Sequence, residues 1–234
     1  MQIKNIAKEL TITILLVVSV FLFITISVQN TVVVGNSMNP TISDTQHIFV
    51  NKMVYIRFSR NIVRHFMPWV SDSPNPVTYP FHQPRRGEII VFYPPGGGNV
   101  EYIKRVIAVP GDKIGLRRGK VVLNGVTLDE PYVQNSSPTT ESRDIITVPV
   151  GNVFVMGDNR PHSEDSRVFG PVPQENIIGK AWVTYWPSSE WGFVRSTGLE
   201  KVFDAAEKAR GAVANILDKQ AAVAASAISI LLKI

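Results

Sequence analysis

The sequence predicts a mainly β protein, an antiparallel barrel or sandwich, that follows an N-terminal transmembrane helix and ends in a helical tail. Three observations indicate this fold class: one long uncharged apolar segment near the N-terminus, many short β-rich segments separated by Gly and Pro, and an alanine-rich C-terminus. We therefore divide the chain into the N-terminus and anchor at 1–29, a β-rich domain at 30–190 with an insertion at about 56–84, and a tail at 199–234.

The anchor is the segment 10–28, which reads LTITILLVVSVFLFITISV and holds no charged residue. A helix of this length crosses a hydrocarbon core of about 30 Å. Its apolar residues surround the whole helix, unlike those of most buried core helices, and no small-x-small cut site follows it. Lys4 and Lys8 precede the segment and the next cation is Lys52, so the positive-inside rule predicts a cytoplasmic N-terminus and an extracytoplasmic β domain.

The β domain is predicted from short runs of branched and aromatic residues that end at Gly, Pro or Asn. The expected strands are 31–34, 47–50, 88–93, 100–109, 121–123, 126–128, 145–150, 153–156 and 178–186. Asn124-Gly125, between two of them, is typical of a two-residue hairpin turn. The residues GGGN at 96–99 also predict a turn, because the Lys and Ser or Thr of a phosphate loop do not follow them.

Two further segments leave alternatives open. Residues 56–69 combine arginines and large apolar residues at helical spacing. This pattern fits a basic amphipathic helix on lipid as well as a surface helix or an irregular insertion. The proline-rich residues 71–84 predict a loop. Residues 199–234 show helical apolar spacing. Their last apolar run, 221–232, is too short to span a membrane alone, which favours a helix on a partner or at the interface over a second span.

The bulk composition excludes several kinds of site. The chain has no cysteine, which excludes disulfides, thiolate metal sites and a cysteine nucleophile. The formal net charge is +5, but the cations are scattered and no recognition motif accompanies them, so we expect no nucleic-acid partner. The 4 histidines show no metal-binding spacing, which argues against zinc catalysis.

Four polar segments are candidates for chemistry. They are GNSMNPT at 35–41, RRGEIIVF at 85–92, YIKRVIAVPGD at 102–112 and GDNRPHSEDSR at 157–167. In the third segment, alternation along a strand puts Lys104 on one face and Arg105 on the other, which a plain core strand would avoid. Ser37 lies in a turn just outside the anchor and is well placed as a nucleophile, although such a serine alone is a weak signal.

A serine and a lysine together can cleave a peptide bond. A serine hydroxyl needs a base to become nucleophilic. A solvated lysine has a pKa of about 10.4, but burial against apolar neighbours lowers that pKa because it disfavours the ammonium form. Neutral Lys104 would then take the proton of Ser37 and pass it to the leaving amine, while the Ser37 backbone N–H would donate to the oxyanion.

The four segments, in this order, resemble those of type I signal peptidases (leader peptidases), serine proteases with a Ser–Lys dyad that cut signal peptides from exported proteins. The likeness covers about residues 10–187, including the anchor. It implies a largely antiparallel β fold, with Ser37 as nucleophile, Lys104 as general base and Ser163 as the serine that orients the lysine. It also implies supporting roles near the site for Asp158, Arg105, Asp165 and Arg167.

The same resemblance implies a substrate and a location. Substrates would be preproteins with small residues at the first and third positions before the cut, held in apolar pockets whose candidate lining residues are Met38, Tyr102, Ile103 and Val106. An extended substrate would add as a strand near Ser37. No cofactor is implied. The implied location is the bacterial cytoplasmic membrane, crossed once, with signal peptides and the bilayer as partners, and an association with the secretion machinery is compatible with this role.

Two positions depart from the family pattern. Gly35 stands where some members carry a hydroxyl that assists the oxyanion, so the second oxyanion donor is not identified, and Ala108 replaces a commoner glycine. Two other functions stay open. One is a Ser-His-Asp hydrolase built from Ser37, His162 and Asp165, which the all-β pattern and the missing Gly-x-Ser-x-Gly turn disfavour. The other is an inactive membrane-tethered binding module of the same fold.

Overall fold

The computed structural model describes residues 2–59, 77–79, 81–133 and 140–196. Residues up to Ser196 form one compact unit. The predicted tail at 199–234 lies outside the described residues. So does most of the segment 56–69, for which a helix was one of the alternatives; its described end contains the short strand β3, Phe58–Ser59.

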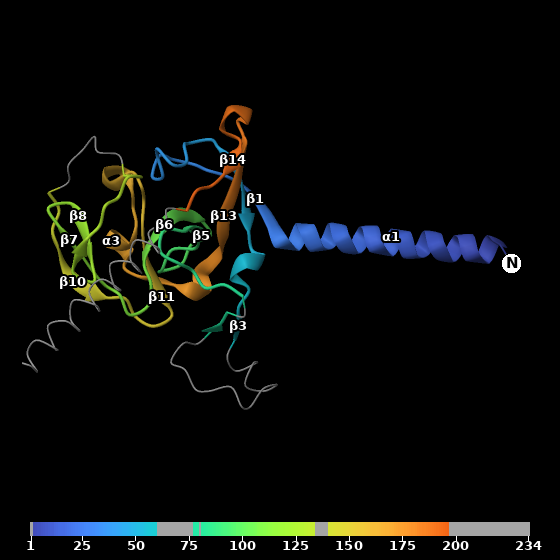
Figure 1. Cartoon of the computed structure of the whole chain (residues 1–234), viewed down its shortest axis with the longest axis horizontal. Helices are drawn as coiled ribbons and strands as arrows, with labels where there is room; N and C mark the ends of the chain where they lie inside the picture. Colours follow the sequence, from blue (N-terminus) through green and yellow to red (C-terminus); the bar gives the residue numbers. More distant parts are fainter. Residues whose placement is uncertain (1, 60–76, 80, 134–139, 197–234) are drawn as a thin grey trace, which may run out of the picture. The chain divides into compact units, whose positions relative to one another are not determined.

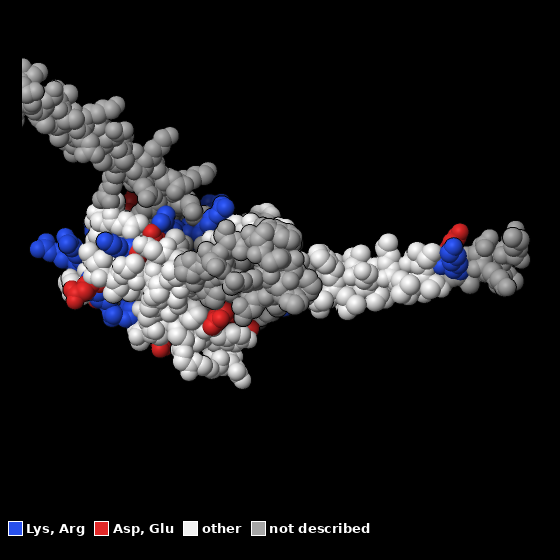
Figure 2. Space-filling view, turned by 90° about the horizontal axis from the view of Figure 1, so that it is seen from below, with Lys and Arg blue, Asp and Glu red and all other residues white. Residues whose placement is uncertain are grey.

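Helix α1 spans Gln2–Ser27 and contains the predicted anchor except for its last residue, Val28, which begins strand β1 (Figure 1). Its segment Lys8–Ser27 has a mean hydropathy of 2.7, and only 6% of it is buried within the protein. In Figure 2 the described part of this helix carries charged residues only near its N-terminal end. An apolar helix with so little burial would expose its side chains to water, which is unfavourable. A lipid bilayer would cover these side chains instead. The predicted apolar helix is therefore confirmed, and its length and exposure are consistent with a membrane span.

The β domain is built on an antiparallel sheet of 8 strands in which β14 pairs with β13 and the others follow the order β1-β2-β13-β5-β6-β11-β12. Figure 1 shows this sheet curling around the core of the domain. The bounds of its strands are β1 Val28–Val32, β2 His47–Asn51, β5 Ile89–Phe92, β6 Tyr102–Ala108, β11 Asn152–Met156, β12 Val172–Pro173, β13 Ile177–Trp186 and β14 Gly192–Phe193.

A second antiparallel sheet has the order β10-β7-β8-β9. Its strands are β7 Lys113–Arg117, β8 Lys120–Leu123, β9 Val126–Thr127 and β10 Arg143–Thr147. The predicted hairpin turn joins β8 to β9, with φ values of 50° at Asn124 and 77° at Gly125. These two positive φ values are those of a type I′ turn, which Asn-Gly favours. A small pair, β3 with β4 (Val77–Thr78), completes the strands.

The remaining described elements are short. They are the helix α3 Ser166–Phe169 and the 3₁₀ turns η1 Met53–Tyr55, η2 Arg160–His162, η3 Gln174–Asn176 and η4 Ser188–Glu190. The mainly β, antiparallel fold class is thus confirmed. Differences from the predicted strands are local: β1 begins at Val28 rather than Thr31, and β3, β4, β7, β12 and β14 were not predicted.

Strand β5 is buried on both faces and separates two apolar cores. Ile90 and Phe92 pack into one core, which also holds Val106 of β6. Ile89 and Val91 pack into the other, which also holds Met38 from the turn after β1. Alternate side chains of a strand point to opposite faces, so β5 contributes to both cores. Dense packing on both faces holds β5 and its neighbour β6 in place, and this fixes the positions of Lys104 and Arg105 on β6.

Candidate active site

The turn that carries Ser37 is held from both sides. Gly35 has a φ of 94°, a backbone conformation that glycine adopts without strain, and its N–H donates to Asp44 at 2.7 Å. Met38, the next residue after Ser37, is fully buried in the core. The Ser37 carbonyl accepts a hydrogen bond from the Asn159 N–H at 3.0 Å. The serine side chain is therefore left at the surface of a fixed turn.

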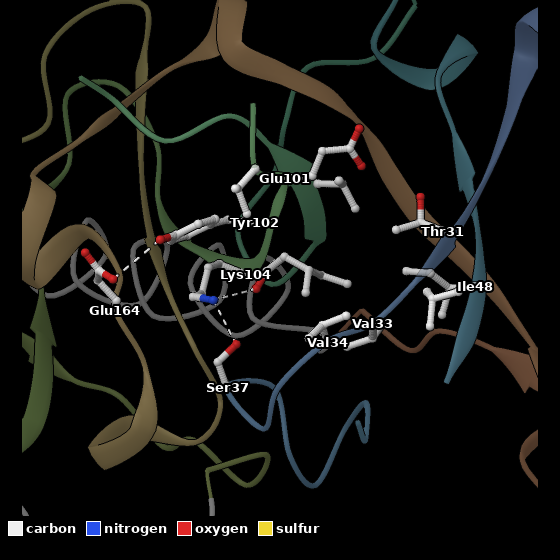
Figure 3. A pocket seen from close by; sticks show the side chains of 13 residues that line it. Thr31, Val33, Val34, Ser37, Ile48, Glu101, Tyr102, Lys104 and Glu164 are labelled. Atoms are coloured by element: carbon white, nitrogen blue, oxygen red, sulfur yellow. Dashed lines mark hydrogen bonds between the residues drawn. The ribbon is translucent and has the colours of Figure 1, made fainter. Parts of the chain in front are cut away.

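Lys104 reaches this serine from β6, where it lies opposite Ile90 of β5. Its Nζ donates to Ser37 Oγ at 2.8 Å and to the Ile103 carbonyl at 3.0 Å, as Figure 3 shows. The lysine is only 5% exposed. Burial lowers the pKa of Lys104 to about 8, although the negative charges of nearby carboxylates act in the opposite direction. A substantial fraction of this lysine is therefore neutral near pH 8 and can accept a proton.

Ser163 lies close to the pair but bonds elsewhere. Its hydroxyl donates to Asp165 Oδ2 at 2.8 Å, and no hydrogen bond joins it to Lys104 among the described residues. The reason is that a carboxylate is a strong acceptor for a hydroxyl. The expected hydrogen bond by which Ser163 would orient Lys104 is therefore not present in the described structure, and the Ser163 hydroxyl is held by Asp165 instead.

Asp165 organises the loop 157–167. It accepts from the Gly157 N–H at 2.9 Å, caps the start of α3, and pairs with the guanidinium of Arg167 at 2.8 Å. Burial alone would raise the pKa of Asp165, but the hydrogen bonds and charge of Arg167 outweigh it and lower that pKa. Asp165 is therefore ionised at neutral pH and holds the loop beside the serine.

Arg105 and Asp158 form a fully buried ion pair behind the site. The guanidinium donates to both carboxylate oxygens, at 2.8 and 2.6 Å, and each side chain has an exposed fraction of 0%. Arg105 also donates to the Gly87 carbonyl at 2.8 Å, and Thr41 donates to Asp158. The pair thereby connects β6, the loop after β11 and the turn that carries Ser37.

A cavity of about 510 Å³ opens in front of the Ser37–Lys104 pair (Figure 3). Two predicted lining residues, Tyr102 and Ile103, line it; the other two, Met38 and Val106, do not, because both are fully buried in the cores. The lining residues that the sequence did not indicate are Thr31, Val32, Val33, Val34, Ile48, Val91, Val100, Glu101 and Glu164. Their proximity to Tyr102 and Ser163 in the sequence was the one signal available for the last three.

The alternative triad is not assembled. The His162 side chain is exposed, and within the described part of the chain no hydrogen bond joins its ring to Ser37 or Asp165. Ser37 Oγ accepts from Lys104 instead. This geometry places the Ser37 hydroxyl within hydrogen-bond distance of a buried amine, beside a cavity large enough for a few residues of an extended peptide.

Comparisons with known proteins also indicate a peptidase. A family model described as "Signal peptidase, peptidase S26" matches residues 3–186. A "Probable signal peptidase I-1" of Synechocystis sp. is 45% identical over 123 residues, which cover 50% of this chain and 62% of that protein. A "Signal peptidase I" of Leptolyngbya laminosa is 42% identical over 123 residues, covering 50% and 60%.

A further relative matches a longer part of the chain. A "Signal peptidase IB" of Staphylococcus aureus is 31% identical over 174 residues, which cover 67% of this chain and 77% of that protein. For the Synechocystis and Leptolyngbya proteins, the chain spans about three fifths of their own length.

Proposed function

Because the chain belongs to the signal peptidase family, peptidase S26, we propose that it is a membrane-bound signal peptidase I, a serine endopeptidase that removes signal peptides from exported preproteins. One observation carries this proposal: a buried lysine amine with a pKa lowered to about 8 lies 2.8 Å from the Ser37 hydroxyl. The three relatives described above are all named as signal peptidases, which supports the same activity.

The reaction begins with neutral Lys104. Its Nζ accepts the Ser37 Oγ proton while Oγ attacks the carbonyl carbon of the cleaved bond, and the Ser37 backbone N–H donates to the oxyanion. The lysine ammonium then protonates the leaving amine nitrogen, and the released chain departs. Water hydrolyses the remaining ester, with Lys104 again as base. The charges of Asp165, Glu164 and Asp158, which raise the pKa of Lys104, favour the ammonium that forms in each step.

The substrate lies in the cavity as an extended chain. Residues 31–34 and 100–103 line the cavity from two directions, and both segments can offer backbone groups to a strand placed between them. Alternate side chains of such a strand face the same way. Residues at the first and third positions before the cut then face apolar side chains such as Val33, Ile48 and Ile103, and both positions take small residues.

The proposed location is the bacterial cytoplasmic membrane, with the N-terminus in the cytoplasm and the catalytic domain outside. Helix α1 is long and apolar enough to cross the membrane once. Lys4 and Lys8 lie at its N-terminal side, which the positive-inside rule assigns to the cytoplasm. Signal peptides and the bilayer are the partners of this role, and an association with the secretion machinery would follow from it.

The activity is tested with the full chain in detergent and a preprotein that carries an Ala-x-Ala site. Wild-type protein is expected to release the mature protein with its new N-terminus directly after the second alanine, as mass spectrometry would show. Ser37→Ala is expected to leave the preprotein intact. If the wild type binds the preprotein without cleaving it, the chain is the inactive binding module instead.

Gly157 supports this chemistry by its lack of a side chain. A Cβ at this position would lie 2.2 Å from Ser163 Oγ and 2.5 Å from the Ser37 carbonyl oxygen, so the Ser37 turn and the loop 157–167 must separate to admit it. Because displacements of about 1 Å cost on the order of a hundredfold in rate, Gly157→Ala is expected to lower kcat/KM by that factor.

The matched control for this substitution is Gly192→Ala. A Cβ at Gly192 meets no atom within 4 Å, and the residue lies in β14, outside the cavity. This variant is expected to retain wild-type kcat/KM. Equal activities for the two variants, measured on the same preprotein, would mean that the close contact at Gly157 does not fix the site.

A further inference from the structure

Two carboxylates, Glu101 and Glu164, line the cavity that holds Ser37 and Lys104, and we call them the acidic rim. Figure 3 shows them on opposite sides of Tyr102: Glu101 on the side toward Thr31, and Glu164 on the side away from Val33 and Val34. They come from different elements, since Glu101 directly precedes β6 and Glu164 lies in the loop between η2 and α3.

The charges of the acidic rim are not neutralised by neighbouring cations. Both oxygens of Glu101 accept from the Gln29 Nε2 atom at 3.0 Å, which is an uncharged amide. Glu164 accepts from the Tyr102 hydroxyl at a long 3.4 Å. Across the described part of the chain, neither carboxylate forms an ion pair, whereas Asp158 and Asp165 behind the site are paired with arginines.

The active form of the cavity is consequently negative. Lys104 is the one cation among the described residues that line it. To act as base, this lysine must be neutral, so the form that reacts presents two carboxylates and no positive charge. A cavity wall with uncompensated charge of one sign attracts ligand groups of the opposite sign. This contrasts with the chain as a whole, whose net charge is +5.

We propose that the acidic rim makes the enzyme prefer substrates that carry Lys or Arg within two residues of the cleaved bond. The inference rests on the proposed function. Side chains at the second position before the cut point away from the apolar wall, because successive side chains of a strand alternate. Glu101, near β1, contacts a cation at that position. Glu164, on the other side of Tyr102, contacts a cation in the first residues after the cut.

The test uses two series of peptides with an Ala-x-Ala site and the full chain in detergent. One series carries Lys, Gln or Glu at the second position before the cut, and the other carries them at the second position after it. The enzymes are wild type, Glu101→Gln, Glu164→Gln, the double variant and, as the control, Glu175→Gln, an exposed carboxylate outside the cavity. The measured quantity is the ratio of kcat/KM for the Lys peptide to that for the Glu peptide.

Wild type and Glu175→Gln are expected to prefer Lys over Glu by about fivefold in each series, which is the scale of an exposed charge pair. Glu101→Gln should reduce the ratio in the first series, Glu164→Gln in the second, and the double variant should bring both near one. Glu164 also raises the pKa of Lys104, but this effect cancels because both peptides meet the same lysine. The preference should weaken as salt is added.

The proposed preference would be wrong if wild type cleaved Lys and Glu peptides at equal rates. It would also be wrong if the double variant kept the wild-type ratio of kcat/KM for the Lys peptide to that for the Glu peptide. Binding of the same peptides to Ser37→Ala, measured by fluorescence anisotropy, separates this inference from the proposed function. If Lys peptides bind more tightly but wild type cleaves none of the peptides, the acidic rim does select cations and the proposed peptidase activity is wrong. If all peptides bind equally and are cleaved at equal rates, the proposed peptidase activity is supported and the proposed charge preference of the acidic rim is wrong.

Discussion

Lys104→Ala is expected to lower kcat/KM for a preprotein by about a thousandfold or more, which is the usual contribution of a positioned general base together with its acid role. No other described side chain donates to or accepts from Ser37 Oγ, so the serine would lose its base. The fold should persist, because Lys104 forms no ion pair in the described structure and its other bond goes to a backbone carbonyl. Cleavage in detergent and the melting temperature of the same sample check both statements.

The control for this prediction is His162→Ala. The His162 side chain is exposed and has no hydrogen bond to Ser37, so wild-type activity is expected. A histidine variant without activity beside an active lysine variant would mean that the base has been misassigned and that a Ser-His pair forms in the working enzyme.

Arg105→Met is expected to destabilise the fold by about 3–5 kcal/mol, because it leaves the fully buried carboxylate of Asp158 without its cation. Thr41 still donates to this carboxylate, but one hydroxyl does not replace a bidentate guanidinium. For a chain of this size the change corresponds to a melting temperature lower by roughly 10 °C. Thermal unfolding of the full chain in detergent measures it.

Arg143→Met provides the comparison. Arg143 pairs with Glu141 at 2.5 Å, but its side chain is 46% exposed, so solvent screens the interaction. We expect a change below about 1 kcal/mol. Similar melting temperatures for the two variants would show that the Arg105–Asp158 pair does not hold β6 to the Ser37 turn.

Several features could be predicted from sequence because they depend on local chemistry alone. A charge-free apolar segment of this length predicts a helix, and α1 contains the predicted anchor up to Ser27. Asn124-Gly125 adopts the left-handed conformations that its turn requires. Strand β6 could be predicted because branched apolar residues flank Lys104 and Arg105 and the run ends at Pro110-Gly111.

Other features depend on contacts distant in sequence and could not be predicted. Strand β7 contains Gly115, which usually weakens a strand, but a Cβ there would lie 3.1 Å from the Arg143 carbonyl, so the glycine permits β10 to approach. Met38 follows the proposed nucleophile but points into the core, because the turn does not follow strand alternation. The position of Glu164 in the cavity depends on how the loop 157–167 folds against β6.

The most direct test of the account is the pH dependence of kcat/KM for a peptide with uncharged residues beside the cut. Because Lys104 must be neutral to accept the proton, kcat/KM should rise about tenfold per pH unit at low pH and reach half its maximum near the lysine pKa of about 8. His162→Ala should give the same profile. A lysine base would be contradicted if the kcat/KM profile of wild type had its midpoint near the ordinary histidine pKa of about 6.5 and His162→Ala lost this pH dependence.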